Sequence, residues 1–148
     1  MLWALKQNDP NNLLYKHEPD AIKNMLALTS CNDNEFVDAL KKYKAAARYH
    51  DNNVESARRQ CEPFINDIEA RLTKHHYIMG DSLSLVDYAT LPFIRQFSRV
   101  DRKWFTQAPY PKLRCWLEKH YQDPIFAKAM TKYSQWLDSN AVVIFGRE

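Results

Sequence analysis

The sequence predicts an all-α fold, a helical bundle of about five main helices plus shorter pieces. Apolar residues recur at spacings of three and four along several segments, which is the pattern of a helix with one buried face. Only two glycines occur, Gly80 and Gly146, so the glycine turns of a many-stranded β fold are scarce. With 148 residues, of which 45% are apolar, the chain is long enough for one domain with a sizeable core.

The N-terminal part of the chain differs from the helices that follow it. Residues 1–7 look like the tail of a helix, because no capping residue precedes them and turn formers stop the segment. Residues 8–19 are predicted to be a linker, and residues 20–148 the helical domain. A short helix that packs on the domain is the alternative for the first segment. Asp20 is a candidate cap for a short helix of the domain. The apolar residues of that helix are Ile22, Met25, Leu26 and Leu28.

Two long helices are predicted next, over residues 35–49 and 54–75. The turn formers Asn32–Asn34 are expected to break the chain before the first, and residues 50–53 separate the two. Pro63 lies inside the second helix and should kink it or divide it into two pieces. The residues expected to be buried are Phe36, Val37, Leu40, Tyr43 and Ala47 in the first helix, and Val54, Ala57, Cys61, Phe64, Ile65, Ile68 and Leu72 in the second.

A polar stretch opens the helix around which the others are expected to pack, over residues 85–100. Ser84 followed three residues later by Asp87 fits a capping box, in which each side chain bonds an amide of the other residue. Leu83 and Tyr88 occupy the two positions of a hydrophobic staple. Since the helix is apolar on nearly every side, we expect it to be buried. A carboxylate at the start of a buried helix needs hydrogen-bond partners, so Asp87 is assigned a structural task.

Proline marks the start of two further helices. Tyr110–Pro111 begins one and Asp123–Pro124 begins the last, because a proline at the first helical position removes no hydrogen bond. Apolar residues continue along the first at Leu113, Trp116, Leu117 and Tyr121. They continue along the last at Ile125, Phe126, Ala129, Met130, Tyr133, Trp136 and Leu137. An apolar tail over residues 141–145 follows.

Composition narrows the class of protein. Cys31, Cys61 and Cys115 are odd in number, far apart and without metal-type spacing, which favours reduced thiols in a cytoplasmic protein. No apolar run is long enough to span a bilayer, and the N-terminus lacks the basic lead of a secretory signal. The formal net charge of +3 is too small to indicate a nucleic-acid surface by itself. We therefore expect neither a membrane nor a nucleic acid as partner.

Three sets of residues invite a functional interpretation. Adjacent His75 and His76 point about 100° apart on a helix, so a solvated helix end is favoured over a metal site. A mixed basic and aromatic set mimics a nucleic-acid patch, although its aromatic residues are expected to serve the core. Its members are Arg95, Phe97, Arg99, Arg102, Lys103, Trp104 and Phe105. Tyr43, Lys44, Ala47 and His50 could line a cleft, with half-buried helix positions as the alternative. No metal ligand set and no self-contained catalytic motif is identified.

The capped stretch also has the form of a family signature. Gly80, Ser84 and Asp87 match the pattern G-x-x-x-[ST]-x-x-D, which resembles the start of the central helix in the C-terminal domain of the glutathione S-transferase family. Pro92 is similar to a proline frequent in that helix. Other landmarks agree in order: the segment 68–72 before the signature, then Tyr110, Pro111, Leu113 and Trp116 after it. The resemblance covers about Asp33 to Leu137, and residues 93–97 with Asp101 resemble a bacterial subgroup.

The resemblance implies an enzyme of two domains with different roles, of which this chain supplies the helical one. Residues 1–7 would be the end of the last helix of a thioredoxin-like domain, and residues 8–19 the interdomain linker. Glutathione, the co-substrate, would bind that missing domain, which also carries the catalytic Tyr, Ser or Cys. The chain is therefore expected to hold no catalytic residue and no cofactor, and to be inactive alone.

The helical domain would shape the pocket for the electrophile that glutathione attacks. Family position suggests Tyr43, Ala47 and His50 for this cleft, with the apolar tail as a lid. A homodimer would form through the helices over residues 35–49 and 54–75. The alternative function is a non-catalytic interaction module, as related helical domains are in translation-factor and synthetase assemblies. An unrelated helical bundle is a third possibility.

Overall fold

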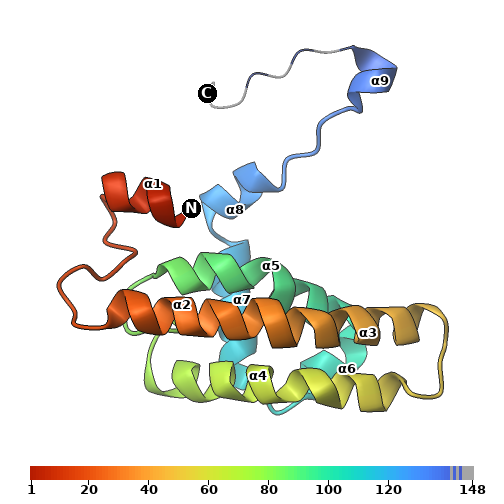
Figure 1. The fold of residues 1–148 in the computed structure, drawn as a ribbon. Helices are drawn as coiled ribbons and strands as arrows, with labels where there is room; N and C mark the ends of the chain where they lie inside the picture. The colour runs from red at the N-terminus through yellow and green to blue at the C-terminus, as the bar shows by residue number, and fades with distance from the viewer. Residues whose placement is uncertain (141, 143, 145–148) are drawn as a thin grey trace. The chain divides into compact units, whose positions relative to one another are not determined.

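A computed structural model describes residues 1–140, 142 and 144. All regular secondary structure in these residues is helical. The all-α class is thereby confirmed. The chain forms two units, Met1–Leu117 and the part from Glu118 onward, which are described separately. The helices are α1 (Leu2–Gln7), α2 (Ala21–Cys31), α3 (Val37–Arg48), α4 (Val54–Lys74), α5 (Leu85–Val100), α6 (Arg102–Gln107), α7 (Pro111–Tyr121), α8 (Pro124–Ala129) and α9 (Trp136–Ser139), with a π-helical turn η1 (Asn32–Phe36) (Figure 1).

The predicted break at Asn32–Asn34 is wrong, because α2 passes through η1 into α3 as one helical rod (Figure 1). Asn32 is fully buried, and its side-chain amide donates to the Asp33 carboxylate at 2.8 Å. Phe36, at the end of η1, stacks on Phe64 of α4 with ring centroids 4.7 Å apart. A π turn takes up one extra residue per turn. Packing of Phe36 thus outweighs the turn preference of the asparagines.

Asp20 precedes α2 as predicted, but its expected role as a side-chain cap is wrong. The residue has a φ of 59° and makes no side-chain bond to the helix. A capping side chain reaches the first-turn amides from an extended backbone, and the left-handed conformation of Asp20 does not provide it.

Helix α4 runs without division from Val54 to Lys74, so the alternative in which Pro63 splits it is wrong. The helix continues past the proline because residues of its apolar stripe are buried on both sides of it. Of the seven residues predicted for this stripe, Val54 is half-buried and the other six are buried. Helix stability in proteins derives largely from such packing.

Helix α5 is the central helix of the first unit and packs against α2, α3 and α6. Its first two turns are the more deeply buried, whereas Pro92 and Arg99 on the later turns are exposed. The rings of Phe36 and Tyr43 lie 6.0 and 5.8 Å from that of Phe97 of α5. The aromatic core therefore joins α5 to the rod formed by α2, η1 and α3.

Contacts that the sequence pattern did not predict cap the starts of two helices. Helix α6 was not expected at all, and Asp101 caps it by accepting from the Trp104 amide at 2.9 Å. Helix α7 begins at Pro111 as predicted, but its first-turn amides are bound from another helix. The Glu69 carboxylate of α4 accepts from the amides of Lys112 and Leu113 at 3.0 and 2.7 Å.

Residues 8–19 are anchored to the first unit. Leu13, Leu14 and Tyr15 are buried, and the Leu85 amide at the start of α5 donates to the Leu13 carbonyl at 2.9 Å. The Tyr15 hydroxyl donates to the Ser82 carbonyl. These contacts join the segment to the loop before α5. The domain boundaries 1–7, 8–19 and 20–148 stay predictions.

In the second unit, the predicted long helix through Leu137 is wrong. Asp123 caps α8 by accepting from the Ile125 amide at 2.8 Å, but the helix ends at Ala129. Among the described residues after it, only the short α9 is helical. Tyr133 and Leu137 are 65% and 83% exposed. Since no burial compensates for the entropy of helix formation, periodic spacing alone does not extend the helix. Of the tail at 141–145, only residues 142 and 144 belong to the described part.

Candidate functional site

The start of α5 is a polar cluster centred on Asp87. Ser84 and Asp87 form a capping box, and both side chains are fully buried. One oxygen of the Asp87 carboxylate, Oδ2, accepts from the Ser84 amide at 2.9 Å and from the Ser84 hydroxyl at 2.6 Å. The other, Oδ1, accepts from the Ile78 amide at 3.1 Å and from the Trp116 indole at 2.9 Å. Four donors saturate the carboxylate, so it ties a loop, α5 and α7 together.

The two staple residues lie beside this cluster. Leu83 and Tyr88 are both half-buried at the start of α5. Their mutual contact stays a prediction. The cluster has no open face toward solvent, which suits it to holding the fold rather than to binding a ligand.

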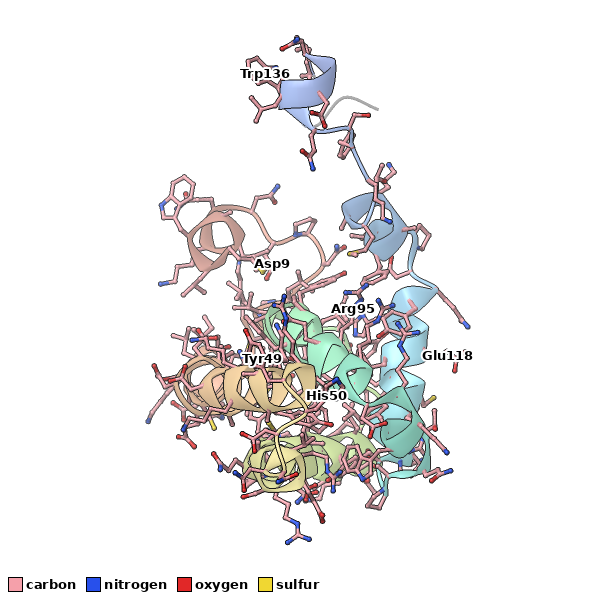
Figure 2. The ribbon with its side chains drawn as sticks, turned by 90° about the vertical axis from the view of Figure 1, so that its right-hand side faces the viewer. Asp9, Tyr49, His50, Arg95, Glu118 and Trp136 are labelled. Atoms are coloured by element: carbon pink, nitrogen blue, oxygen red, sulfur yellow. The ribbon has the colours of Figure 1, made fainter. Side chains whose placement is uncertain are left out.

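The other end of α5 borders a cleft of about 620 Å³. Tyr43, Ala47 and His50, the three residues proposed from the sequence, all line it. Figure 2 looks onto this end of the helices, where α3 leads into α4, with Tyr49 and His50 labelled. The further lining residues are Asp51, Val54, Arg99, Val100, Asp101 and Arg102. The structure therefore brings the proposed residues together, while their role toward a substrate stays a prediction.

His50 reaches the cleft through an unusual backbone conformation. Its φ of 54° lies in the left-handed region, which costs a non-glycine residue about 1 kcal/mol. The Asp51 amide donates to the Ala46 carbonyl at 2.9 Å, closing a Schellman turn in which His50 stands where glycine is usual. The strained position ends α3 and leads the chain along the cleft toward α4.

Tyr43 lines the cleft although only 1% of the residue is exposed. Burial raises the pKa of Tyr43 to about 12, with the Asp101 carboxylate adding to the shift and the Arg58 guanidinium opposing it. At neutral pH the side chain can thus donate a hydrogen bond but does not act as a base. The exposed side chains of the cleft offer a bound molecule an imidazole, two arginines and two carboxylates.

Four lining residues, Arg99 to Arg102, were not identified as part of the cleft from the sequence. They lie at the junction of α5 and α6, which meets α3 only in the folded chain. The available signal was the concentration of basic residues from Arg95 to Lys103. From the sequence, these basic residues were compared with a nucleic-acid patch instead.

The aromatic members of that patch are not free to stack on bases. Phe97 and Phe105 are buried in the core, with ring centroids 6.1 Å apart. The half-buried Trp104 has the Arg58 guanidinium 4.1 Å above its ring. The expectation that these aromatic residues serve the core is confirmed for Phe97 and Phe105.

A second, smaller groove of about 410 Å³ continues from the cleft along α3 and α5, which pack against each other. Ala47, Arg99 and Val100 line both hollows. Lys44, Arg48 and Gln96 complete the groove. The Lys44 ammonium donates to the Gln96 side-chain oxygen at 2.6 Å, so even its closest partner is neutral.

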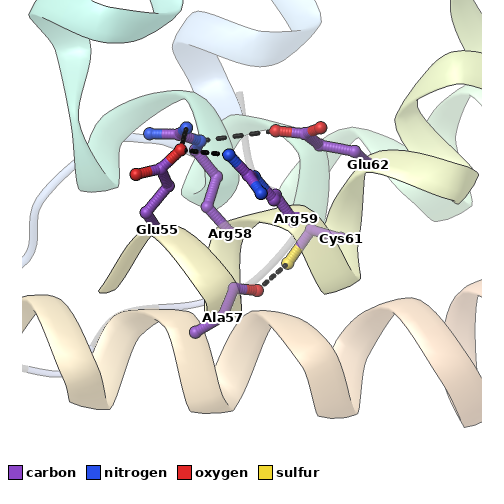
Figure 3. Close-up of polar contacts among 6 residues, drawn as sticks. All are labelled: Glu55, Ala57, Arg58, Arg59, Cys61 and Glu62. Carbon is purple, nitrogen blue, oxygen red and sulfur yellow. Dashed lines mark hydrogen bonds and ion pairs between the residues drawn. The ribbon is translucent and has the colours of Figure 1, made fainter. Parts of the chain in front are cut away.

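Neither the histidine pair nor the cysteines form a reactive centre in the described part. His75 lies with its Nδ1 3.8 Å from the Asp81 carboxylate. Among the described residues, no three His, Cys, Asp or Glu side chains are grouped as metal ligands require. Burial raises the pKa of the Cys31 thiol, and that of Cys61 to about 12. The Cys61 thiol instead donates to the Ala57 carbonyl at 3.7 Å (Figure 3). None of the helices in the described ranges could cross a bilayer.

Comparison with protein families places the site in context. Residues 47–119 match the family described as glutathione S-transferase, C-terminal domain. The match begins at Ala47 in the cleft and runs through α4, α5, α6 and most of α7, so it includes the Asp87 cluster. No curated protein matches the chain. Residues 47–119 are thereby identified as a glutathione S-transferase C-terminal domain.

Proposed function

We propose that the chain is the electrophile-binding half of a bacterial glutathione S-transferase. The observation that carries the proposal is the cleft at the end of α5, where Tyr43, Ala47 and His50 lie side by side in a domain of this family. A cleft of about 620 Å³ is within the range of small-molecule sites. In this scheme the cleft holds an apolar or aromatic electrophile, with Tyr43 in its wall.

The nucleophile in this scheme is the thiolate of glutathione, bound by a thioredoxin-like domain. The raised pKa values of the Cys31 and Cys61 thiols and of the Tyr43 hydroxyl support this division, because none of these groups is ionised at neutral pH. The chain alone then conjugates or reduces no substrate. Residues 1–7 and 8–19 are the end of the thioredoxin-like domain and the linker in the same proposal.

Ala47 allows a direct test of the cleft. Ala47→Trp fills the space between α3 and α5, whereas Ala45→Trp adds the same bulk at an exposed position of the same helix outside the lining. Dinitrobenzene, an unreactive analogue of an aromatic electrophile, is the probe, and its binding is measured by NMR line broadening. We expect the Ala47 variant to lose binding and the Ala45 variant to keep it. Equal binding by both variants would remove the cleft from the proposal.

Turnover is the second readout. With glutathione and chloro-dinitrobenzene, the purified chain should show no conjugation above a heat-killed control. Measured turnover would contradict the assignment of the nucleophile to another domain. Homodimerisation through α3 and α4 is also proposed, and sedimentation should then give twice the 17.5 kDa mass of the chain. A monomeric mass at micromolar concentration would count against it.

A non-catalytic interaction module is the second candidate. Exposed apolar side chains at the N-terminal end of the chain favour it, since Met1 and Trp3 are 71% and 77% exposed. Such a module needs no ligand in the cleft. Retained binding of dinitrobenzene by the unmodified chain, lost in Ala47→Trp, therefore separates the enzyme half from the module.

A further inference from the structure

The second unit carries most of the large apolar residues that are exposed in the described part of the chain. Those within α8 and α9 or between them are Ile125, Met130, Tyr133, Trp136 and Leu137. Exposed apolar residues that cluster in one segment mark a site of interaction, whereas scattered ones do not.

These residues share one face if the helix begun by α8 continues to Asp138. At about 100° per residue, the apolar residues of the range 125–138 other than Ala127 fall within an arc of about 140°. They are Ile125, Phe126, Ala129, Met130, Tyr133, Trp136 and Leu137. The polar residues on the opposite side are Lys128, Thr131, Lys132, Ser134, Gln135 and Asp138. This separation is typical of a helix that lies between an apolar medium and water.

The structure forms only the two ends of this helix. Residues 131–135, between α8 and α9, are not helical. The range 125–138 contains no proline or glycine that would interrupt a helix, and Asp123 already caps its start. Because a short helix in water is unstable without burial, the missing turns should form when an apolar surface covers the face.

Charge and aromatic residues indicate the kind of surface. Lys128 and Lys132 lie one turn apart at the same edge of the apolar face, next to Ile125. Tyr133 and Trp136 each join an apolar ring to a polar group, which suits the boundary between lipid and water. Lysine side chains at such an edge can extend to anionic headgroups, so the charge of the segment is complementary to an anionic bilayer.

A second copy of the chain would not supply the matching charge. The other edge of the apolar face is bordered by Ala127 and Ser134, neither of which is acidic. Two such helices packed antiparallel would bring their lysine edges together, and packed parallel they would set the lysines against Ala127 and Ser134. Asp138 lies on the polar face, away from both edges.

We propose that residues 125–138 form one amphipathic helix on the surface of a bilayer that contains anionic lipids. Its apolar face is buried at the boundary of headgroups and acyl chains, and Lys128 and Lys132 contact lipid phosphates. At about 1.5 Å per residue the helix is about 21 Å long, too short to cross a bilayer. The expectation of no membrane partner rested on the lack of a spanning segment, which a surface helix does not need. The proposal goes beyond the proposed function, and its failure would leave the electrophile cleft untouched.

Vesicles of two compositions test the proposal with the full chain. Phosphatidylcholine vesicles are neutral, and vesicles of equal parts phosphatidylcholine and phosphatidylglycerol are anionic. Co-sedimentation measures binding, and circular dichroism measures helix content. We expect binding to the anionic vesicles, with a gain of helix that corresponds to residues 130–135, and much weaker binding to the neutral ones.

Two serine variants test the apolar face. Tyr133→Ser/Leu137→Ser removes two of its residues and should weaken binding to the anionic vesicles by about 100-fold. Leu26→Ser/Tyr49→Ser makes the same change at exposed residues of the first unit and should leave binding unchanged.

Two glutamine variants test the lysine edge. Lys128→Gln/Lys132→Gln should bind the anionic vesicles about 25-fold more weakly than the unmodified chain. Lys16→Gln/Lys23→Gln makes the same change of net charge at exposed residues of the first unit and should bind as the unmodified chain does. Added salt should weaken binding by the unmodified chain more than by the Lys128/Lys132 variant. All substituted residues are exposed, so the first unit should stay folded, which urea unfolding checks.

Other outcomes overturn the proposal. The absence of binding to anionic vesicles would do so directly. Unchanged binding by the Tyr133/Leu137 or the Lys128/Lys132 variant would assign the bilayer contact to other residues. Equal losses in a variant and its control would reduce the effect to overall hydrophobicity or net charge. A doubled mass without lipid that is lost in Tyr133→Ser/Leu137→Ser would assign the face to a second copy.

Discussion

The two ends of α5 differ in the burial and the partners of their charged residues. At its start, Asp87 is completely buried and its carboxylate receives four hydrogen bonds. At its end, the exposed Arg99 lines two open hollows and has no acidic partner among the described residues. A buried charge is tolerated only when it is saturated by partners, whereas an exposed charge needs none. One end of the helix therefore maintains the fold, and the other is available for binding.

Replacement of Asp87 should give the largest effect on stability. Asp87→Ala leaves the Ile78 amide, the Ser84 amide and the Trp116 indole without an acceptor in the core. Each unpaired buried donor costs about 1–3 kcal/mol, so the free energy of unfolding should fall by about 3–5 kcal/mol. Urea unfolding measures it.

Asp81→Ala is the matched control for this variant. Asp81 is exposed and accepts from the His76 amide at 3.2 Å in the same loop. Its replacement should change the free energy of unfolding by about 0.5 kcal/mol. If the two alanine variants were equally stable, the Asp87 cluster would not be the structural centre of the first unit.

The contrast between the two ends also shows what the sequence can predict. The pairing of Ser84 with Asp87 is local, three residues apart, and follows from helix geometry. The bonds from Ile78 and Trp116 to the same carboxylate span 9 and 29 residues, and no local pattern predicts them. The Glu69 cap on α7, 43 residues away, is of the same kind. Local chemistry located the cluster, and tertiary contacts set its strength.

Errors in the predicted helices have the same origin. The asparagines of η1 favour a turn locally, but burial of Phe36 against Phe64 carries the helix through them. Beyond Ala129 the periodic apolar residues find no such burial, and the helix stops. For the cleft, Tyr43, Ala47 and His50 share one helix face and its end, so they could be proposed together. Arg99 comes from a distant segment and could not.

Tyr43 provides a pH test at the binding end. Its folded pKa of about 12 lies above the usual value of 10.0, so the neutral form is favoured in the folded chain. Stability from this group is complete below about pH 10 and is lost as the pH rises toward 12. When the pH is raised from about 9 to about 11, the free energy of unfolding should therefore fall by about 1 kcal/mol less in Tyr43→Phe than in the unmodified chain. Thermal unfolding at the two pH values measures the difference, and equal losses would contradict the desolvation of the hydroxyl.

The smallest expected effect comes from a pair of arginines that differ in surroundings. Arg58 of α4 is half-buried, lies over the Trp104 ring and pairs with Glu62 at 3.4 Å. Arg58→Gln removes a partly desolvated ion pair and a cation–π contact and should lower the unfolding free energy by about 1 kcal/mol. Arg99→Gln removes an exposed, unpaired charge next to other cations. Its unfolding free energy should change by less than about 0.5 kcal/mol, and at low salt the relief of repulsion should make the change stabilising.

Salt distinguishes the two arginines further. Screening weakens the attraction lost in Arg58→Gln and the repulsion relieved in Arg99→Gln, so both differences from the unmodified chain should shrink as salt is added. Their signs at low salt should be opposite, which a common effect of net charge cannot produce because each variant loses one positive charge. A marked destabilisation by Arg99→Gln would mean that Arg99 supports the fold, and the end of α5 would then resemble its start.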